Sequence, residues 1–243
     1  MTLRCHKVLI TGGGSGIGFA IAQKLVALGA QVVITGRTEE KLRKAAAALG
    51  PQAYYLTMDV TDVSRCAACI AEAAEMMGGL DGLVNNAGAC AYTHEWGEGM
   101  YLQTEEEWDR VMNTNVKAPF FLSRAAVEYM RKNNVQGNIH NVISEAAFVP
   151  ASASYGASKH ALKALTEGLS GHAIRFGIVV NAIAPGTTAT DFVDIEGELQ
   201  KKRQKNGRLA TAEEIAELSV FMMSVEGENI IGQTFLSCGG STI

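Results

Sequence analysis

Short apolar runs alternate with longer periodic segments along the first half of the chain. The short runs are typical of buried strands, whereas apolar residues that recur every three or four positions indicate amphipathic helices. Strands are predicted at residues 7–10, 31–35, 53–58 and 80–84, and helices at 17–28, 39–49 and 62–77. Strands that alternate with helices imply a parallel sheet that helices cover on both faces.

The second half continues this alternation with longer elements. A helix is predicted at 104–132, and Thr104 and Glu107 form a capping-box pattern at its start. Pro119 lies in the middle of this helix, where a proline usually produces a kink. Backbone groups near Asn115 are therefore expected to be free to bind water. Further strands are predicted at 138–143 and 178–184.

A loop at 90–103 separates the two halves and is rich in glycine, aromatic and polar residues. It leaves the edge of the sheet at which ligands bind, so it either lines a substrate pocket or lies on the plain surface. His94 in this loop is a candidate base, although the sequence shows no partner for it.

Composition and charge exclude several classes of protein. The net charge of −4 and the lack of a basic run argue against a nucleic-acid surface. No run approaches the ~20 apolar residues of a membrane-spanning helix, and no signal peptide is recognisable. Five scattered cysteines suggest reduced thiols and a cytoplasmic location. Cys66 and Cys69 could hold a metal, but buried packing is the expected role because no second ligand pair accompanies them.

The strand at 7–10 ends in a glycine-rich loop, and a predicted helix follows the loop directly. Glycines allow the backbone to approach a pyrophosphate, and the start of a helix offers free amides and a positive dipole to it. This arrangement predicts a dinucleotide site. The loop residues expected to bind the cofactor are Gly12, Ser15, Gly16, Ile17 and Gly18.

Arg37 follows the second strand, at the place where NAD-binding sites usually carry an acidic residue for the ribose 2′-hydroxyl. A guanidinium at this place suits a 2′-phosphate, because it can donate two parallel hydrogen bonds to phosphate oxygens. NADP(H) is therefore favoured over NAD(H). Arg37 could instead be a surface residue or stack on adenine, and Glu39 and Glu40 lie nearby.

Polar side chains follow the next two strands. Asp59 comes after the strand at 53–58 and Asn86 comes after the strand at 80–84. Ligands in parallel sheets bind beyond the carboxyl ends of the strands, so both residues are expected to lie near the cofactor. Asp59 could instead cap the following helix, although Asp62 is better placed for that role.

Tyr155 and Lys159 stand four positions apart on a predicted helix, and therefore on one face of it. A free phenol has a pKa near ~10, and a fixed ammonium beside it favours the phenolate. We therefore expect Lys159 to lower the pKa of Tyr155 and to make it a general acid or base. The pair alone is a weak signal, because this spacing occurs by chance in many helices.

Taken together, these motifs resemble those of the short-chain dehydrogenase/reductase family, in its small single-domain form. The resemblance runs in order over essentially the whole chain and implies a Rossmann-like doubly wound, mainly seven-stranded parallel sheet with helices on both faces, in one domain over residues 1–243. The matching residues are Thr11, Gly12, Gly16, Ile17, Gly18, Asp59, Asn85, Asn86, Ala87, Gly88, Asn115, Ser144, Tyr155, Lys159, Asn181, Pro185 and Gly186, followed by 207–209, 232–233 and 239–240.

The resemblance implies a role for each catalytic residue. Tyr155 would give a proton to the substrate carbonyl oxygen on reduction, or take it from the hydroxyl on oxidation. Lys159 would bind the nicotinamide ribose and lower the tyrosine pKa. Ser144 would hydrogen-bond the substrate oxygen and stabilise the charge that develops on it. Asn115 would position a water that links Lys159 to solvent.

The resemblance also places the cofactor along the chain. Asp59 with Val60 is expected at the adenine, and Asn86 with Ala87 and Gly88 is expected near the cofactor ribose. The nicotinamide amide is expected at residues 185–190, where the predicted contacts are Pro185, Gly186, Thr188 and Thr190.

The chain departs from the family pattern in several places. One serine, Ser144, ends the strand where the family usually has two, and the interval from Ser144 to Tyr155 is about two residues shorter than is common. Ser152 and Ser154 are nearby hydroxyls. Glu145 is unusual and either biases the pocket towards polar or cationic substrates or faces solvent, which is the expected role.

Three further residues affect the tail and the assembly. Cys238 stands where the family often has an aspartate. Gly168 and Gly171 lie inside the predicted Tyr155 helix, and small residues there allow another helix to approach closely. Because the family usually pairs this helix across subunit interfaces, we expect a homo-oligomer, a tetramer or a dimer. Packing within one subunit is the alternative.

These observations predict a cytoplasmic NAD(P)(H)-dependent oxidoreductase that interconverts a ketone and a secondary alcohol in a small molecule. One alternative is a 3-oxoacyl-carrier-protein reductase, which would need a basic patch for its acidic carrier. Arg124, Arg131 and Lys132 are the candidates for that patch. An alternative of another class is a non-catalytic dinucleotide sensor. Such a protein would be expected to lack Tyr155 or Lys159, and both are present.

Overall fold

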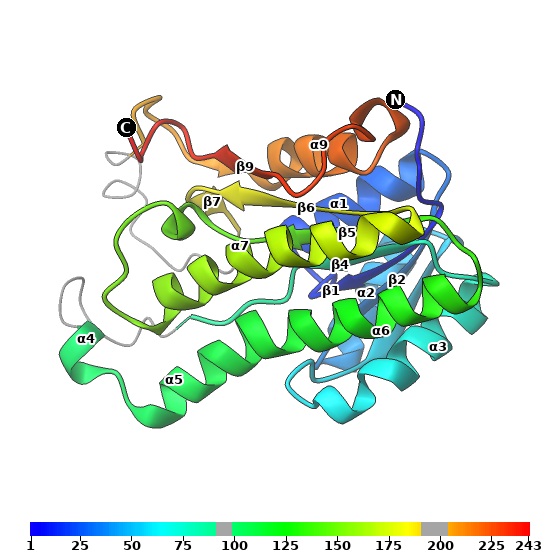
Figure 1. Ribbon diagram of the computed structural model, residues 1–243, viewed down its shortest axis with the longest axis horizontal. Helices are drawn as coiled ribbons and strands as arrows, with labels where there is room; N and C mark the ends of the chain where they lie inside the picture. Colours follow the sequence, from blue (N-terminus) through cyan, green and yellow to red (C-terminus); the bar gives the residue numbers. More distant parts are fainter. Residues whose placement is uncertain (91–98, 191–203) are drawn as a thin grey trace.

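Seven parallel strands form the central sheet of the protein, whose computed structural model describes residues 1–90, 99–190 and 204–243 (Figure 1). Their order across the sheet is β3-β2-β1-β4-β5-β6-β9. The strands are β1 (Lys7–Thr11), β2 (Gln31–Gly36), β3 (Ala53–Thr57), β4 (Gly82–Asn85), β5 (Gly137–Val142), β6 (Ile178–Pro185) and β9 (Thr234–Ser237). Two short strands, β7 (Thr188–Ala189) and β8 (Ala210–Thr211), pair with each other. The predicted parallel sheet is confirmed.

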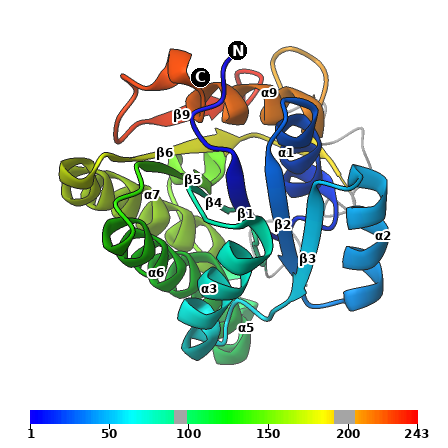
Figure 2. The same ribbon diagram turned by 90° about the vertical axis from the view of Figure 1, so that its right-hand side faces the viewer.

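Helices cover both faces of the sheet, as Figure 2 shows. Helices α1, α2 and α9 lie on one face, and α3, α6 and α7 lie on the other. Their bounds are α1 (Gly16–Ala27), α2 (Glu39–Leu49), α3 (Cys66–Met77), α6 (Ala118–Lys132), α7 (Ser154–Ala173) and α9 (Ala212–Met222). The doubly wound arrangement is therefore the one that the sequence pattern predicts.

The central strand β1 shows why both faces need a cover. Successive side chains of a strand point to opposite faces of its sheet. Val8 and Ile10 belong to the core cluster that α1, α2 and α9 complete, and Leu9 belongs to the cluster that α3 and α6 complete. All three side chains are fully buried. Strand β1 therefore needs a continuous apolar run, because both of its faces are buried.

The strand order reverses at β1. The chain leaves β1 on one side for β2 and β3, and it then returns to the other side for β4, β5 and β6. In open parallel sheets, ligands bind at such a reversal, outside the carboxyl ends of the strands. The glycine loop after β1 and the residues after β4 both lie there. The strand order alone therefore predicts a ligand site at this reversal.

The helix predicted at 104–132 is instead three elements: α5 (Glu105–Met112), a π-helix (Asn113–Lys117) and α6. Thr104 and Glu107 form the predicted capping box at the start of α5. Pro119 lies in the first turn of α6, and it has no N–H for the carbonyl of Asn115, four residues earlier. A distortion near Asn115 was therefore expected, and it takes the form of this π-helix.

Two other predicted regions differ in extent from the structure: the loop at 90–103, and the helix at 62–77, which is a 3₁₀ helix (Val63–Arg65) followed by α3. Of the loop predicted at 90–103, residues 91–98 with His94 lie outside the described residues, and the rest contains the short helix α4 (Gly99–Leu102). Asp62 caps the helical segment that precedes α3 and accepts a hydrogen bond from the Ser64 amide at 3.2 Å, as predicted. Within the described ranges, no helix is long and apolar enough to cross a membrane.

Candidate active site

The glycine loop after β1 presents backbone amides that the chain itself does not cap. Ser15 precedes the first turn of α1, but its side chain makes no capping hydrogen bond, and that turn holds no acidic residue. The first amides of a helix need an acceptor and lie at the positive end of its dipole. The start of α1 is therefore suited to an anion such as a pyrophosphate.

Glycine is needed at two positions of this loop for different reasons. Gly12 has a φ of 64°, in the left-handed region that side chains disfavour. A Cβ on Gly18 would lie 2.6 Å from the carbonyl oxygen of Gly12. Helix α1 can therefore approach the loop only if residue 18 has no side chain. A bare turn would not need this close approach, so the geometry agrees with a ligand cradle.

The residues after β4 hold the loop from the other side. The Asn86 side chain donates to the carbonyls of Thr11 at 2.9 Å and Gly12 at 3.1 Å. The Thr11 hydroxyl in turn accepts hydrogen bonds from the amides of Asn86 and Ala87, both at 3.0 Å. The Asn86 side chain thus fixes the shape of the loop. Thr11, to which the sequence assigned no role, holds the loop and the residues after β4 together.

Arg37 and Asp59 follow the carboxyl ends of β2 and β3, on the β2–β3 side of the reversal. Hydrogen bonds from the Thr61 backbone and hydroxyl, at 2.9 and 2.7 Å, lower the pKa of Asp59, and the charge of Arg37 lowers it further. Arg37 is exposed, and Val60 is buried. The predicted adenine and 2′-phosphate residues are therefore neighbours.

Tyr155 and Lys159 lie one turn apart near the start of α7, as predicted. The ammonium nitrogen of Lys159 is 5.5 Å from the centroid of the Tyr155 ring and donates to the carbonyl of Val142 at 3.4 Å. The Tyr155 hydroxyl is hydrogen-bonded to the side chain of Ser144, which follows β5. The structure thus brings Ser144, Tyr155 and Lys159 together from two elements.

The sequence predicts a lowered pKa for Tyr155, and this prediction is wrong for the chain without a cofactor. Burial raises the pKa of Tyr155 to about 12, and the hydrogen bond from Ser144 only partly offsets it, while Cys90 and Glu145 raise it further. Burial lowers the pKa of Lys159 to about 8. Sequence reasoning counted the neighbouring charge but not the loss of water around both groups, which disfavours each charged form.

Asn115 joins this group from the π-helix. Its side chain is fully buried and exchanges two hydrogen bonds with the backbone of Ala89, at 2.8 and 2.9 Å. Its amide also donates to the hydroxyl of Ser158 at 3.0 Å, one residue before Lys159. A Cβ on Gly88 would lie 3.7 Å from Asn115 Oδ1 and 3.9 Å from Lys159 Nζ. The predicted Asn115 therefore lies beside the lysine.

The segment after β6 closes the other end of the cradle. Thr188 donates its hydroxyl hydrogen to the carbonyl of Gly186 at 3.0 Å, which holds this turn together. A Cβ on Gly16 would lie 3.4 Å from the side chain of Thr190. The predicted nicotinamide segment, 185–190, thus returns to the start of α1. The fold brings the two halves of the predicted dinucleotide site into contact.

Glu145 does not face solvent, so the expectation for it is wrong. The side chain is half-buried and accepts a hydrogen bond from the Ser241 hydroxyl, in the C-terminal tail. Its carboxylate also lies close to Gly186, because a Cβ there would be 3.1 Å from Glu145 Oε2. The partner is 96 residues away in the sequence, so no local pattern indicates this contact.

Other contacts that support the site were also missed. Gln103 and Ser154 exchange two hydrogen bonds, at 2.6 and 2.9 Å, and these bonds fix the start of α7 below Tyr155. Ser158 was not singled out, although its hydroxyl holds Asn115. A serine three residues after Tyr155, on a helix that carries the reacting groups, was the available signal for it.

Known proteins resemble this chain over nearly its whole length. A family model described as short chain dehydrogenase matches residues 6–201. The chain belongs to this family. Galactitol 2-dehydrogenase from Agrobacterium fabrum is 33% identical to it, with 99% of each chain covered. Members are oxidoreductases that bind NAD(P), and the chain is such an enzyme, acting on alcohol or carbonyl groups.

Two solved structures show the same fold. A short chain dehydrogenase from Burkholderia cenocepacia, in complex with NADP, has a TM-score of 0.88 at 32% identity and covers 98% of each chain. A 3-ketoacyl-(acyl-carrier-protein) reductase from Brucella melitensis, complexed with NADH, has a TM-score of 0.90 at 28% identity, with 97% of this chain and 98% of that chain covered. Both nicotinamide cofactors therefore occur among the relatives.

Proposed function

We propose that the protein interconverts a ketone and a secondary alcohol, with Tyr155 as the general acid and base. The observation that carries this proposal is the hydrogen bond between Tyr155 and Ser144, beside the buried ammonium of Lys159. On reduction, the Tyr155 hydroxyl donates its proton to the substrate oxygen. Ser144 donates a hydrogen bond to the same oxygen as negative charge develops there.

The uncapped amides of α1 and the segment 185–190 fit a dinucleotide, because the first lack an acceptor and the second lies against Gly16. Bound NAD(P)(H) would supply or accept a hydride. The residues of the chain supply placement and the proton. Lys159 and Asn115, which lie beside each other at Gly88, would return that proton from solvent through a bound water.

The pKa values of the site favour reduction at neutral pH. With its pKa raised to about 12 by burial, Tyr155 is protonated and ready to donate. Lys159, with its pKa lowered to about 8 by burial, is still mostly protonated at pH 7. Its ammonium therefore stabilises the phenolate that a proton transfer leaves behind. Oxidation would need this phenolate beforehand, so it would become faster at higher pH.

NADP(H) is the proposed cofactor. Arg37 is exposed at the end of β2 and lies near Asp59, where a ribose 2′-phosphate would reach it. The test compares wild type, Arg37→Asp and Arg37→Ala in their KM for NADPH and for NADH. We expect Arg37→Asp to raise the KM for NADPH and to leave that for NADH nearly unchanged. An unchanged preference in both variants would remove the proposal.

A homo-oligomer, a tetramer or a dimer, is also proposed. Helices α6 and α7 lie side by side at the front of Figure 1. On α7, Gly168 and Gly171 have no atom within 4 Å of a Cβ built on them, so a second helix could approach there. Phe120 on α6 is 47% exposed, which is large for a phenylalanine. Light scattering that returned a monomer at micromolar concentration would contradict this assembly.

We further propose that residues 1–243 form one domain that works in the cytoplasm on a small-molecule substrate, without nucleic acid. The five cysteines all lie in the described ranges and no disulfide joins any two of them, which fits a reducing compartment. The net charge of −4 does not suit a polyanion. Among the described residues, no group of three or more His, Cys, Asp or Glu is arranged to hold a metal ion.

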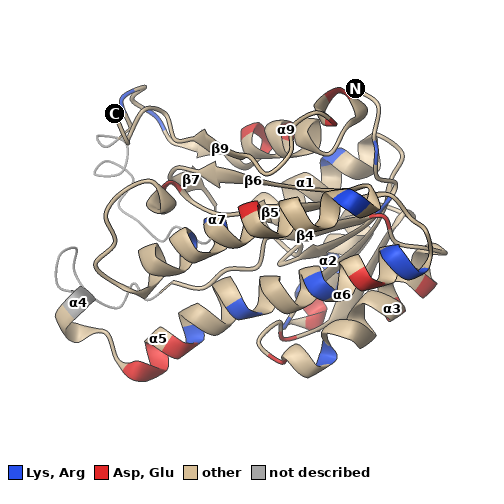
Figure 3. Ribbon diagram, viewed as in Figure 1, with Lys and Arg blue, Asp and Glu red and all other residues tan. Residues whose placement is uncertain are grey.

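A 3-oxoacyl-carrier-protein reductase is the alternative substrate class. Figure 3 shows basic residues along α6, with one acidic residue among them. Lys132 is paired with Glu128 at 3.1 Å, so one of the three candidate cations is partly neutralised. The acidic start of α5 would also repel an acidic carrier. A small free carbonyl compound therefore suits this surface better than a carrier-bound one.

The experiment is a panel of ketones and secondary alcohols, including an acyl-carrier thioester, assayed with both cofactors. Tyr155→Phe is the test variant and Tyr54→Phe, on β3 and away from the site, is the matched control. We expect wild type and control to react with part of the panel and Tyr155→Phe to lose that activity. Equal rates in wild type and Tyr155→Phe would defeat the catalytic assignment of Tyr155. No reaction of wild type with any compound of the panel would favour a non-catalytic dinucleotide sensor.

A further inference from the structure

A cavity of about 110 Å³ lies next to the nicotinamide segment. Three stretches of chain form it: the turn after β6, the stretch around β8 and the C-terminal turn after β9. Its lining residues are Gly186, Thr187, Gln204, Asn206, Arg208, Ala210, Glu214, Ser237, Cys238 and Gly239. Tyr155, Lys159 and Ser144 are not among them. Gly186 belongs to the predicted nicotinamide contacts, but the proposed reaction assigns no role to Gln204, Arg208 or Cys238.

Cys238 supplies a sulfur atom to the cavity wall. Burial alone raises the pKa of its thiol, but hydrogen bonds from the side chains of Thr242 and Ser241 and from the backbone of Gly240 and Thr242 outweigh it. The pKa of Cys238 is therefore below its ordinary value of 9.0. Gly239 and Gly240, with φ of 59° and 83°, fold the tail back over the sulfur. Hydrogen bonds of this kind stabilise a thiolate.

Gln204 supplies a donor without an acceptor to the same cavity. The side chain is 4% exposed, and its Nε2 has no hydrogen-bond partner within the described part of the chain. Its Oε1 lies 2.8 Å from the position that a Cβ on Gly239 would occupy, so the amide lies beside the residue after Cys238. A buried amide without a partner is rare and calls for an acceptor atom in the cavity.

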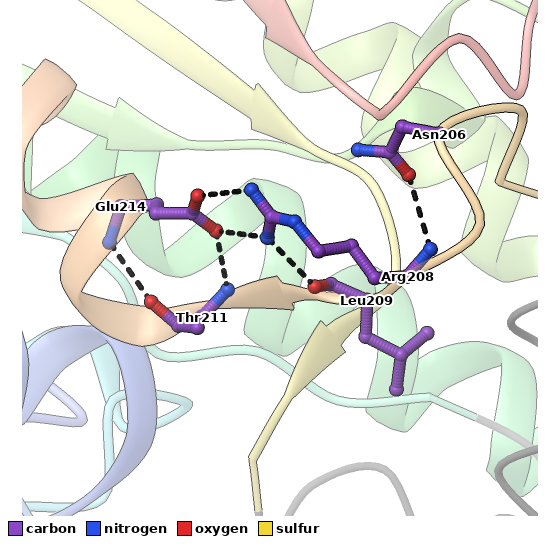
Figure 4. A network of polar contacts seen from close by, with 5 residues as sticks. All are labelled: Asn206, Arg208, Leu209, Thr211 and Glu214. Atoms are coloured by element: carbon purple, nitrogen blue, oxygen red, sulfur yellow. Dashed lines mark hydrogen bonds and ion pairs between the residues drawn. The ribbon is translucent and has the colours of Figure 1, made fainter.

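Arg208 lines the cavity but is not free to bind an anion there. Figure 4 shows its guanidinium against the Glu214 carboxylate and the carbonyl of Leu209. The Nη1 atom donates to Glu214 at 2.7 Å and to Leu209 at 3.1 Å. Glu214 also closes the capping box of α9 with Thr211. This wall is therefore fixed and its charges are paired, which favours a small neutral ligand over an ion.

We propose that Cys238 is a peroxide-reactive thiol and that the Gln204 amide donates to the oxygen atom that the sulfur gains. The Cys238 thiolate attacks one oxygen of hydrogen peroxide, an S–O bond forms and the O–O bond breaks. The sulfur is oxidised by two electrons to a sulfenic acid, and the departing hydroxide takes a proton to become water. The cavity has room for the peroxide and for the added oxygen.

Three of the other four described thiols, those of Cys5, Cys66 and Cys69, are internal controls. Burial raises the pKa of Cys5, Cys66 and Cys69, that of Cys69 to about 12. A lower pKa gives a larger thiolate fraction at neutral pH, so Cys238 holds more thiolate than Cys69. Because the thiolate is the nucleophile, oxidation by peroxide should be selective for Cys238 among these four.

The test treats the purified protein with hydrogen peroxide, quenches it, and alkylates the remaining thiols after denaturation. Mass spectrometry of the cysteine peptides then gives the rate of free-thiol loss at each residue. We expect Cys238 to be lost at least about tenfold faster than Cys5, Cys66 or Cys69, and dithiothreitol to restore it. Loss of Cys238 no faster than that of Cys69 would overturn the proposal.

The role of Gln204 is tested with Gln204→Met, which keeps the length of the side chain but removes the amide. The exposed Gln233→Met is the matched control. We expect the sulfenic acid, trapped with a cyclic 1,3-dione after removal of peroxide, to decay several times faster in Gln204→Met than in the control. Equal decay would remove the role of Gln204. Neither readout needs a substrate or a dinucleotide, so both are independent of the proposed function.

Discussion

Replacing His140 by leucine should make the protein less sensitive to acid. His140 lies in the middle of β5, between Val84 on β4 and Asn181 on β6. Its side chain is fully buried, and neither ring nitrogen has a hydrogen-bond partner among the described residues. It points to the same face as Asn138, whose amide bonds the carbonyl of Met222 on α9. Burial therefore lowers the pKa of His140 from 6.5 to about 3.

This shift sets both the sign and the size of the effect. Below pH 6.5 the unfolded chain binds a proton at His140 that the folded chain does not bind until about pH 3. The contribution of His140 to the free energy of unfolding is therefore fully present above pH 6.5. It decreases as the pH falls, by up to about 1.4 kcal/mol per pH unit. At pH 5, His140 alone removes about 2 kcal/mol of the stability that is present at pH 8.

The assay is urea unfolding of wild type, His140→Leu and the control His160→Gln, whose histidine is exposed on α7, at pH 8 and at pH 5. We expect the loss of unfolding free energy between the two values to be about 2 kcal/mol smaller in His140→Leu than in the other two proteins. An identical loss in wild type and His140→Leu would refute the reasoning, because it would mean that His140 does not stay neutral in the fold.

Three other predictions concern the site. Thr11→Val removes the acceptor for the amides of Asn86 and Ala87. It should therefore lower the free energy of unfolding by about 1–3 kcal/mol and weaken dinucleotide binding. An unchanged free energy of unfolding together with an unchanged Kd would contradict this prediction. Ser158→Ala removes the hydroxyl that accepts a hydrogen bond from Asn115. It should lower kcat roughly two- to tenfold with little change in the KM for the dinucleotide. A kcat equal to that of wild type would count against a positioning role of Ser158. Ketone reduction should slow above about pH 8 as Lys159 loses its proton, and a flat pH–rate profile to pH 10 would argue against its ammonium.

The strands, most helices and the ligand edge of the sheet could be predicted from the sequence. Each strand before residue 86 is a short apolar run, and burial on both faces requires such runs in a parallel sheet. Helix α9 was not predicted, although Thr211 and Glu214 form a capping box before its apolar residues. Strand β9 was missed because it is a short run on the sheet edge, with Phe235 and Leu236 partly exposed.

The pKa values of the site could not be predicted because they depend on burial. The spacing of Tyr155 and Lys159 indicates a neighbouring charge, but only the packed structure shows how much water both groups lose. Glu145 is a similar case, because its partner Ser241 comes from the far end of the chain. The π-helix at Asn115 could be predicted only in part, because Pro119 indicates that the helix is distorted but does not indicate the form of the distortion.

The central claim, that the Tyr155 hydroxyl transfers the proton, is tested most directly by measuring dinucleotide affinity and turnover in the same preparation of Tyr155→Phe. Removing one hydroxyl should change the Kd for NADPH by roughly tenfold at most, the value of one hydrogen bond. The kcat for ketone reduction should fall about 10²- to 10⁴-fold, because the general acid is lost. A variant that bound NADPH and reduced ketones as fast as wild type would contradict the account.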